Sequence, residues 1–140
     1  MKILLAHDGS AQSDKALAEA ATLCEKFGAS LTILNVVPDL CLSTVEVSQD
    51  ECSLVSNSLL ADARGSLKHA TALAESKGVK ADVLIRDGRP AELIVETAKE
   101  IKADYLVLGS TGKHGAKKFF MGSVSTKVAE HALCTVIIVK

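Results

Sequence analysis

Aromatic residues are scarce in this chain. Its 140 residues include no tryptophan, and phenylalanine and tyrosine together account for only 3%. Because hydrophobic residues still make up 48% of the sequence, the core has to be built from Leu, Val, Ile and Ala. That mix is typical of a parallel sheet buried between helices. The length suits one domain over residues 1–140 with a sizeable core.

A strong net charge and a long apolar run are also missing. The formal net charge is −1 at pH 7, so no overall field attracts nucleic acid or an acidic membrane. No apolar run reaches the length of a membrane span. At the N-terminus, His7 and Asp8 interrupt the apolar stretch too early for a signal peptide. We therefore expect a cytoplasmic protein that binds neither nucleic acid nor membranes.

No C-x-x-C pair occurs among the four cysteines. Cys24 and Cys134 lie in apolar surroundings and are predicted to be small core residues. Cys41 and Cys52 fall in a predicted loop, so a thiol-based redox sensor built on these two is one hypothesis. A zinc site is disfavoured because the cysteine and histidine spacing matches no compact ligand pattern. Reduced thiols are the default expectation.

Short apolar runs alternate with segments of helical periodicity along the whole chain. The runs predict five strands, over 3–6, 31–37, 81–85, 105–108 and 135–139. The periodic segments between them predict four helices: one with helical spacing over 16–27 and a stop at Gly28, two over 55–76 and 90–101, and a last one marked by residues 124–132. This alternation is typical of the α/β class, a doubly wound parallel sheet in a three-layer sandwich.

Turn and cap residues mark the boundaries of these elements. Ser10 or Asp8 can cap the first helix, and Pro90 suits the first position of the third. Pro38 is predicted to break the second strand, and residues 38–54 are predicted to form a loop, with a lid over the site as one interpretation. Residues 86–90 are predicted to form a turn.

The segment 109–125, GSTGKHGAKKFFMGSVS, joins the fourth predicted strand to the last helix. Gly109, Gly112 and Gly122 allow the main chain to approach a ligand closely, or to take a positive φ. Backbone N–H groups and a helix N-terminus in such a loop suit an anion. The segment is neither a P-loop nor a dinucleotide fingerprint, since its glycine spacing differs from both. The loop therefore predicts a phosphate site, with a purely structural loop as the alternative.

Side chains in the same loop add to this prediction. Ser123 and Ser125 can offer hydroxyls to phosphate oxygens, and Ser123 can also cap the last helix. Four basic residues could supply positive charge to the phosphates, and an ordinary solvated loop is the alternative explanation for them: Lys113, His114, Lys117 and Lys118.

A second polar loop, Asp8-Gly9-Ser10, follows the first predicted strand. Ligands of doubly wound sheets bind beyond the carboxyl ends of the strands, where the winding reverses. Both loops line one crevice if the first and fourth strands are neighbours, which suggests the order 3-2-1-4-5 with two helices on each face. Asp8 could then accept hydrogen bonds from ribose hydroxyls, or serve only as a helix cap. Val36 and Val37 could flank a flat base, or be ordinary core valines.

A convincing catalytic set is missing. There is no G-x-S-x-G motif, no cysteine with an evident histidine partner and no motif of paired carboxylates. Hydrolysis of a nucleotide needs a positioned water and stabilisation of transition-state charge. The sequence assigns no residue to either role, so whether the protein is an enzyme stays open.

Five segments carry a family resemblance over essentially the whole chain: ILLAHDGS, LTILNVV, GRPAELIVETAKEIKADYLVLGS, GSTGKHGAKKFFMGSVSTKV and TVIIVK. The chain resembles the universal stress proteins. Its glycine spacing is similar to that of the family's ATP-binding branch. The resemblance implies the strand order 3-2-1-4-5, ATP as the ligand and Mg²⁺ held through the phosphates.

The resemblance also implies roles for individual positions. It places Ala6, Asp8, Ser10 and the backbone of Val36 around the ribose and the base. Leu108 and Gly109 would close the nucleoside pocket. The residues expected to contact the phosphates are Gly112, Lys113, Gly122, Ser123, Val124 and Ser125. His7 and Thr111 depart from the residues common in the family at their positions, which affects the ribose end and the phosphate charge.

Universal stress proteins form dimers through their last strand, and the segment 135–139 fits that role. It is apolar and unbroken by charge or proline, as expected of an edge strand that pairs with another chain. Together with the family resemblance, these features predict an ATP-binding homodimer in stress response or signalling, with slow or no hydrolysis and unknown protein partners. An Mg²⁺-dependent ATPase or nucleotide hydrolase is the alternative, and the thiol-based redox sensor is a weaker one.

Overall fold

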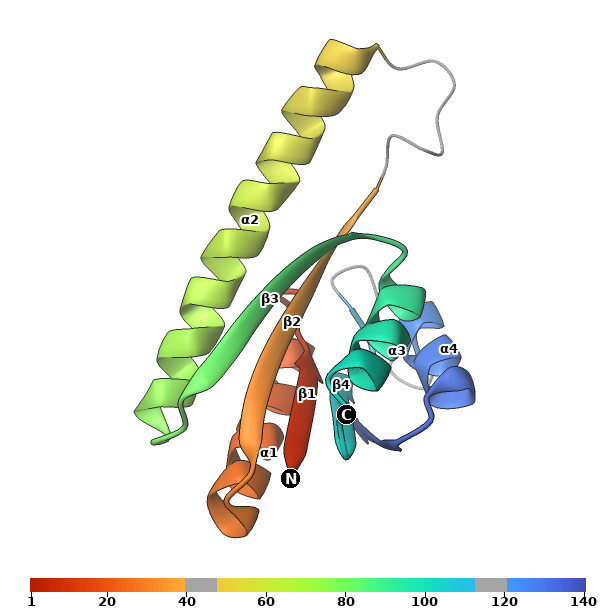
Figure 1. The fold of residues 1–140 in the computed structure, drawn as a ribbon. Coiled ribbons are helices and arrows are strands. Elements are labelled where there is room, and N and C mark those ends of the chain that lie inside the picture. Colours follow the sequence, from red (N-terminus) through yellow and green to blue (C-terminus); the bar gives the residue numbers. More distant parts are fainter. Residues whose placement is uncertain (40–47, 113–120) are drawn as a thin grey trace.

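The computed structural model describes residues 1–39, 48–112 and 121–140 (Figure 1). Its strands are β1 (Lys2–Ala6), β2 (Ser30–Pro38), β3 (Ala81–Gly88), β4 (Tyr105–Gly109) and β5 (Thr135–Val139). Its helices are α1 (Ala11–Phe27), α2 (Gln49–Ser76), α3 (Pro90–Glu100) and α4 (Ser123–His131). The strands form one parallel sheet of order β3-β2-β1-β4-β5. The predicted fold class and strand order are confirmed.

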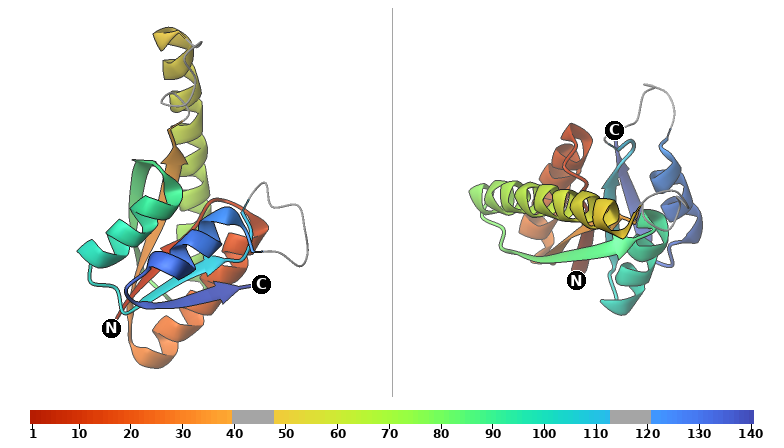
Figure 2. Two further views of the ribbon diagram at one scale, coloured as in Figure 1. Left: turned by 90° about the vertical axis from the view of Figure 1, so that its right-hand side faces the viewer. Right: turned by 90° about the horizontal axis from the view of Figure 1, so that it is seen from above.

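Helices α1 and α2 cover one face of the sheet, and α3 and α4 cover the other (Figure 2). Alternate residues of β1 point to opposite faces. Ile3 and Leu5 pack against α1 and α2, and Leu4 packs toward α3 and α4. All three are fully buried, and burial of each such side chain contributes about 1.5–3 kcal/mol. The central strand therefore joins two cores, both built from aliphatic residues as expected.

The predicted helix boundaries of α1 and α3 agree with the structure. The Ser10 hydroxyl accepts a hydrogen bond from the Ser13 N–H at 3.1 Å and caps α1. Gly28 ends this helix with a φ of 62°. Pro90 occupies the first turn of α3, where its missing N–H costs nothing.

Helix α2 begins at Gln49, six residues earlier than predicted. Ser48 and Glu51 form a capping box, in which each side chain accepts from the other residue's backbone N–H. The first turns of α2 extend beyond the sheet (Figure 1) and leave Leu54 71% exposed. Because these turns pack on little, their sequence carries no helical periodicity. The rest of the predicted loop, residues 40–47, lies outside the described residues.

The prediction that residues 86–90 form a turn was wrong, because β3 continues to Gly88. Strand β2 ends at Pro38 itself, one residue beyond the predicted end at Val37. Val36, Val37 and Pro38 pair with Arg86, Asp87 and Gly88 at the ends of β2 and β3. The β1–β2 register ends earlier, at Ala6↔Leu34. The Leu34 carbonyl accepts the last hydrogen bond that comes from the β1 side. Backbone orientation repeats every two residues in a strand, so the backbone nitrogen of Pro38, four residues later, points to the same side as the Leu34 carbonyl. Its missing N–H therefore faces no neighbouring strand, which is where a sheet tolerates proline.

No helix in the described part of the chain, α2 with its 28 residues included, has a stretch apolar enough to cross a membrane.

Candidate functional site

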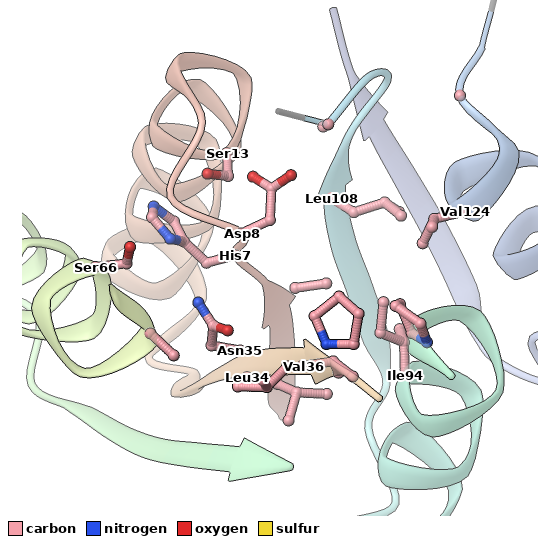
Figure 3. Close-up of a pocket in the computed structure, with 18 of the residues that line it drawn as sticks. His7, Asp8, Ser13, Leu34, Asn35, Val36, Ser66, Ile94, Leu108 and Val124 are labelled. Atoms are coloured by element: carbon pink, nitrogen blue, oxygen red, sulfur yellow. The ribbon is translucent and has the colours of Figure 1, made fainter. Parts of the chain in front are cut away.

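A cavity of about 480 Å³ lies at the carboxyl edge of the sheet. It opens beyond the ends of β1 and β4, which are neighbours in the sheet. After β1 the chain continues to α1 on one face of the sheet, and after β4 it continues to α4 on the other face. This is the switch point at which doubly wound sheets bind ligands. Figure 3 shows side chains from β1, β2, α1, α2, α3, β4 and α4 around it.

Ten of the twelve sequence-predicted site residues line this cavity: Ala6, Asp8, Val36, Leu108, Gly109, Gly112, Gly122, Ser123, Val124 and Ser125. Ser10 does not, because its hydroxyl is committed to the cap of α1. Lys113 lies outside the described residues, as do His114, Lys117 and Lys118.

Asp8 joins the two loops that follow β1 and β4. Its Oδ1 accepts a hydrogen bond from the Ser10 N–H at 2.9 Å, which orders the turn into α1. A Cβ added at Gly112 would lie 2.8 Å from Oδ2 of Asp8. The helix cap itself is Ser10, so the carboxylate of Asp8 remains at the cavity rather than over the helix end.

The loop glycines serve close approach and not unusual backbone angles. A Cβ at Gly109 would lie 3.0 Å from Cβ and 3.1 Å from the carbonyl carbon of Gln12, so this glycine lets β4 approach α1. Gly122 has a φ of −65° and is the N-cap of α4. The predicted alternative of a positive φ at these glycines was wrong, as was the prediction of Ser123 as the cap. Gly122 is the cap because its backbone is extended and its carbonyl accepts the first helical hydrogen bond, from the Thr126 N–H at 3.0 Å.

Ser123 and Ser125 occupy different surroundings at the start of α4. The Ser125 hydroxyl is buried and donates to the carbonyls of Ser110 at 2.8 Å and Gly122 at 3.0 Å, so it fastens the two ends of the loop together. Ser123 is exposed at the first position of the helix and faces the cavity. The first N–H groups of a helix have no partner within it and attract anions. The cavity therefore meets the positive end of α4 beside Ser123.

The two sides of the cavity differ in chemistry. The side toward α3 and α4 is apolar and consists of Ala6, Leu34, Val36, Pro90, Ile94, Leu108 and Val124. The side toward α1 and α2 carries polar groups, from His7, Ser13, Asn35, Asp62 and Ser66. We call these the apolar wall and the polar wall. None of the five polar-wall residues was predicted as a site residue.

The sequence carries only weak signals for the polar wall. Asn35 stands alone among the aliphatic residues of LTILNVV, and such an amide in a buried strand is the one hint. Asp62 and Ser66 lie in a helix separated from β2 by a long segment, so only the tertiary fold brings them to the cavity.

His7 is a structural anchor of the β1–α1 loop. Its ring is fully buried, and Nδ1 accepts from the Gly9 N–H at 3.2 Å. That contact assigns the proton to Nε2, which donates to Oδ1 of Asp14 at 2.9 Å. The other oxygen of Asp14 lies 3.4 Å from Nε2 of His69. Two histidines that showed no pattern in the sequence thus meet at one carboxylate.

No disulfide is formed by the cysteines within the described residues, which are Cys24, Cys52 and Cys134. Burial raises the pKa of the Cys24 and Cys134 thiols and so disfavours their thiolates. Cys52 lies in α2 and not in a loop as predicted, because α2 begins earlier. Cys41 lies outside the described residues, so the redox hypothesis stays a prediction. Within residues 1–39, 48–112 and 121–140, no group of three or more His, Cys, Asp or Glu side chains could hold a metal ion.

The parallel sheet, its flanking helices and the cavity at the switch point define a doubly wound α/β domain. The family model described as the universal stress protein family matches residues 1–140, and the chain belongs to that family. A universal stress protein of Methanocaldococcus jannaschii is 34% identical over 139 residues, which cover 99% of this chain and 81% of that protein. The universal stress protein YxiE of Bacillus subtilis is 35% identical over 145 residues, with coverage of 99% and 98%.

Solved structures show the same fold. The universal stress protein UspA from Lactobacillus plantarum superposes with a TM-score of 0.89 at 26% identity and covers 100% of this chain and 97% of its own. A universal stress protein in complex with cAMP gives a TM-score of 0.72 at 24% identity, covering 100% of this chain and 96% of that one. The Archaeoglobus fulgidus protein in complex with dAMP gives 0.74 at 21%, covering 100% and 98%. The last two likenesses are of fold alone.

Proposed function

We propose that this universal stress protein binds an adenine nucleotide, ATP in particular, in the cavity at the carboxyl edge of the sheet. The observation that carries the proposal is the pairing of an apolar wall with the open N-terminus of α4 in one cavity. An apolar wall suits a flat base, and a helix N-terminus suits phosphate. Structures of this fold with cAMP and dAMP support the proposal, because the fold accommodates such ligands.

In this proposal the phosphates lie on the loop between β4 and α4. Gly112 and Gly122 have no side chain to occupy this space. The N-terminal N–H groups of α4 and the Ser123 hydroxyl donate to the phosphates, and Val124 lies alongside. Ser125 acts through the main chain, since its hydroxyl already holds Ser110 and Gly122. Lys113 remains a predicted phosphate contact outside the described residues.

The nucleoside lies over the ends of β1 and β2. Ala6, Leu108 and Gly109 surround it, and the Asp8 carboxylate is placed to accept from ribose hydroxyls. Val36 offers its backbone to the base. Its peptide groups share the orientation of the Leu34 carbonyl, toward β1, but β1 pairs only as far as Leu34. The backbone of Val36 therefore faces the cavity mouth.

We further propose a cytoplasmic homodimer with slow or no hydrolysis, in which Mg²⁺ is bound through the phosphates. Asp8 and Asp62 are the carboxylates that line the cavity among the described residues. Strand β5 lies at one edge of the sheet, beside β4, and offers its other edge to a second copy. A stress-related signalling role follows from the family.

Calorimetric titration with Mg-ATP tests the binding proposal, on the wild type and on a Gly122→Val variant checked for folding. We expect micromolar binding that the variant loses, because a larger side chain at residue 122 meets the Ser110 carbonyl, 3.4 Å from a Cβ. Steady-state turnover on the same samples separates a binding module from an enzyme. A binding module falls far below the typical turnover of about 10 per second.

A further inference from the structure

We propose that Asn35 is a specificity-determining residue, whose side-chain amide hydrogen-bonds the polar edge of the bound base. The proposal rests on the proposed nucleotide binding and adds a side chain that reads the base. Asn35 belongs to β2 and lies on the polar wall, next to Val36, whose backbone faces the cavity mouth.

The Asn35 amide is buried and has no partner among the residues that the structure describes. The residue is only 5% exposed, and within residues 1–39, 48–112 and 121–140 no hydrogen bond or ion pair holds its side chain. In that same part of the chain, Oε1 of Gln12 is the one fully enclosed side-chain atom without a partner. The amide of Asn35 is therefore not sealed in the core but opens onto the cavity that the residue lines. A buried amide costs free energy unless something hydrogen-bonds it.

Neighbouring polar groups are already committed elsewhere. Both ring nitrogens of His7 are used, by the Gly9 N–H and by Asp14. The Ser13 hydroxyl donates to the Ser10 carbonyl at 2.7 Å. Figure 3 shows Asn35 with His7 and Ser66 on the same side of the cavity. The amide is thus left for a ligand, with Ser66 and Asp62 of α2 completing the polar wall beside it.

The position of Asn35 favours the base over the phosphates. Strand β1 lies between β2 and β4, so Asn35 stands two strands away from Gly109, where the phosphate loop begins. Neighbouring strands are about 4.8 Å apart, which puts about 10 Å between the two ends of the site. A ligand with phosphate at the α4 end therefore brings its base to β2. The apolar wall, with Ile94 and Leu108, then faces the flat side of the ring.

An asparagine amide carries one acceptor and one donor group side by side. The edge of adenine presents an amino donor beside a ring-nitrogen acceptor, and the two patterns match in a pair of hydrogen bonds. The Asp62 carboxylate, an acceptor at the same wall, also favours an amino group over a carbonyl on the base.

The test is a titration of wild type and Asn35→Leu with two ligands, ATP and purine riboside 5′-triphosphate, which lacks the amino group. We expect Asn35→Leu to lower the affinity for ATP about tenfold or more, and to lower the affinity for purine riboside 5′-triphosphate by a clearly smaller factor. The preference for ATP therefore shrinks. Asn57→Leu makes the same change at an exposed position of α2 away from the cavity and should leave both affinities unchanged.

Unchanged ATP affinity in a folded Asn35→Leu variant, or equal loss for both ligands, would overturn the proposal. If this variant fails to fold, Asn35→Val keeps a residue suited to a strand and is titrated in the same way. Absence of ATP binding in the wild type would instead count against the proposed function itself.

Discussion

The backbone of Gly112 lies against the carboxylate of Asp8, so closely that a Cβ at residue 112 would be 2.8 Å from Oδ2. The two residues come from loops 104 positions apart in the sequence, one after β1 and one after β4. Their contact fixes how the proposed ribose end and phosphate end of the cavity face each other. A side chain at residue 112 must displace the carboxylate of Asp8.

We predict that Gly112→Ala lowers ATP affinity about tenfold, equivalent to 1.4 kcal/mol, with little change in the free energy of unfolding. Asp8 is exposed, so its side chain can move aside at small cost to the fold, but it then leaves its place in the cavity. Calorimetric titration and urea unfolding measure the two effects.

Gly65→Ala is the matched control for this substitution. Gly65 lies within α2, and a Cβ there meets nothing within 4 Å. The control should stabilise the protein by about 0.5–1 kcal/mol and leave ATP affinity unchanged. Equal affinity in Gly112→Ala and the wild type would show that the Asp8 carboxylate does not contact the ligand.

A second prediction separates two serines of the same helix. Ser123→Ala should weaken ATP binding with little effect on stability, because Ser123 is exposed and faces the cavity. Ser125→Ala should lower the free energy of unfolding by about 0.5–1.5 kcal/mol, because it removes a buried hydroxyl that donates to the Ser110 and Gly122 carbonyls. Titration and urea unfolding of both variants give the comparison. The reverse assignment of the two effects would contradict the geometry described for α4.

Most of the fold could be predicted from the sequence because its signals are local. The aliphatic runs of β1 and β4, the cap at Ser10 and Pro90 at the start of α3 each act within a few residues. The two loops at the switch point could be found for the same reason. Ten predicted site residues were brought together at the cavity by the strand order alone.

What could not be predicted depends on distant neighbours. Residues 86–88 look like a turn, but they form strand because β2 extends beyond β1 and offers them a partner. The first turns of α2 lack periodicity because they pack on little. The polar wall joins Asn35 of β2 to Asp62 of α2, a contact surface that no sequence pattern encodes.

The capping box of α2 gives a third prediction. Ser48→Ala removes the acceptor of the Glu51 N–H and should cost the first turn about 1 kcal/mol. Because this end of the helix projects from the sheet, the loss should appear as local fraying and not as global unfolding. Hydrogen exchange of the amides near residue 51 should accelerate, and exchange near Ala70, which is fully buried, should not.

Ser58→Ala provides the comparison, since Ser58 is exposed in the same helix and caps nothing. Alanine favours helix over serine, so exchange in this variant should stay the same or slow. Similar acceleration in both variants would mean that the capping box does not hold the helix end.

The last prediction concerns pH and the ion pair that joins β3 to the end of α3. The hydrogen bond from Arg86 to Glu100 holds the pKa of the Glu100 carboxyl below its usual value. A lowered pKa in the folded state means that the pair stabilises the protein above the ordinary glutamate pKa. This contribution is lost as the pH falls through the lowered value.

Urea unfolding of wild type and Glu100→Gln at pH 7 and near pH 3 tests this sign. The wild type should have the higher midpoint at pH 7. The difference should shrink at low pH and in high salt, because Glu100 is exposed and Arg86 is partly exposed. Glu130→Gln makes the same charge change on an exposed site of α4 and controls for net charge. A difference between wild type and Glu100→Gln that is as large at pH 3 as at pH 7 would show that Glu100 stabilises the fold through packing and not through its charge.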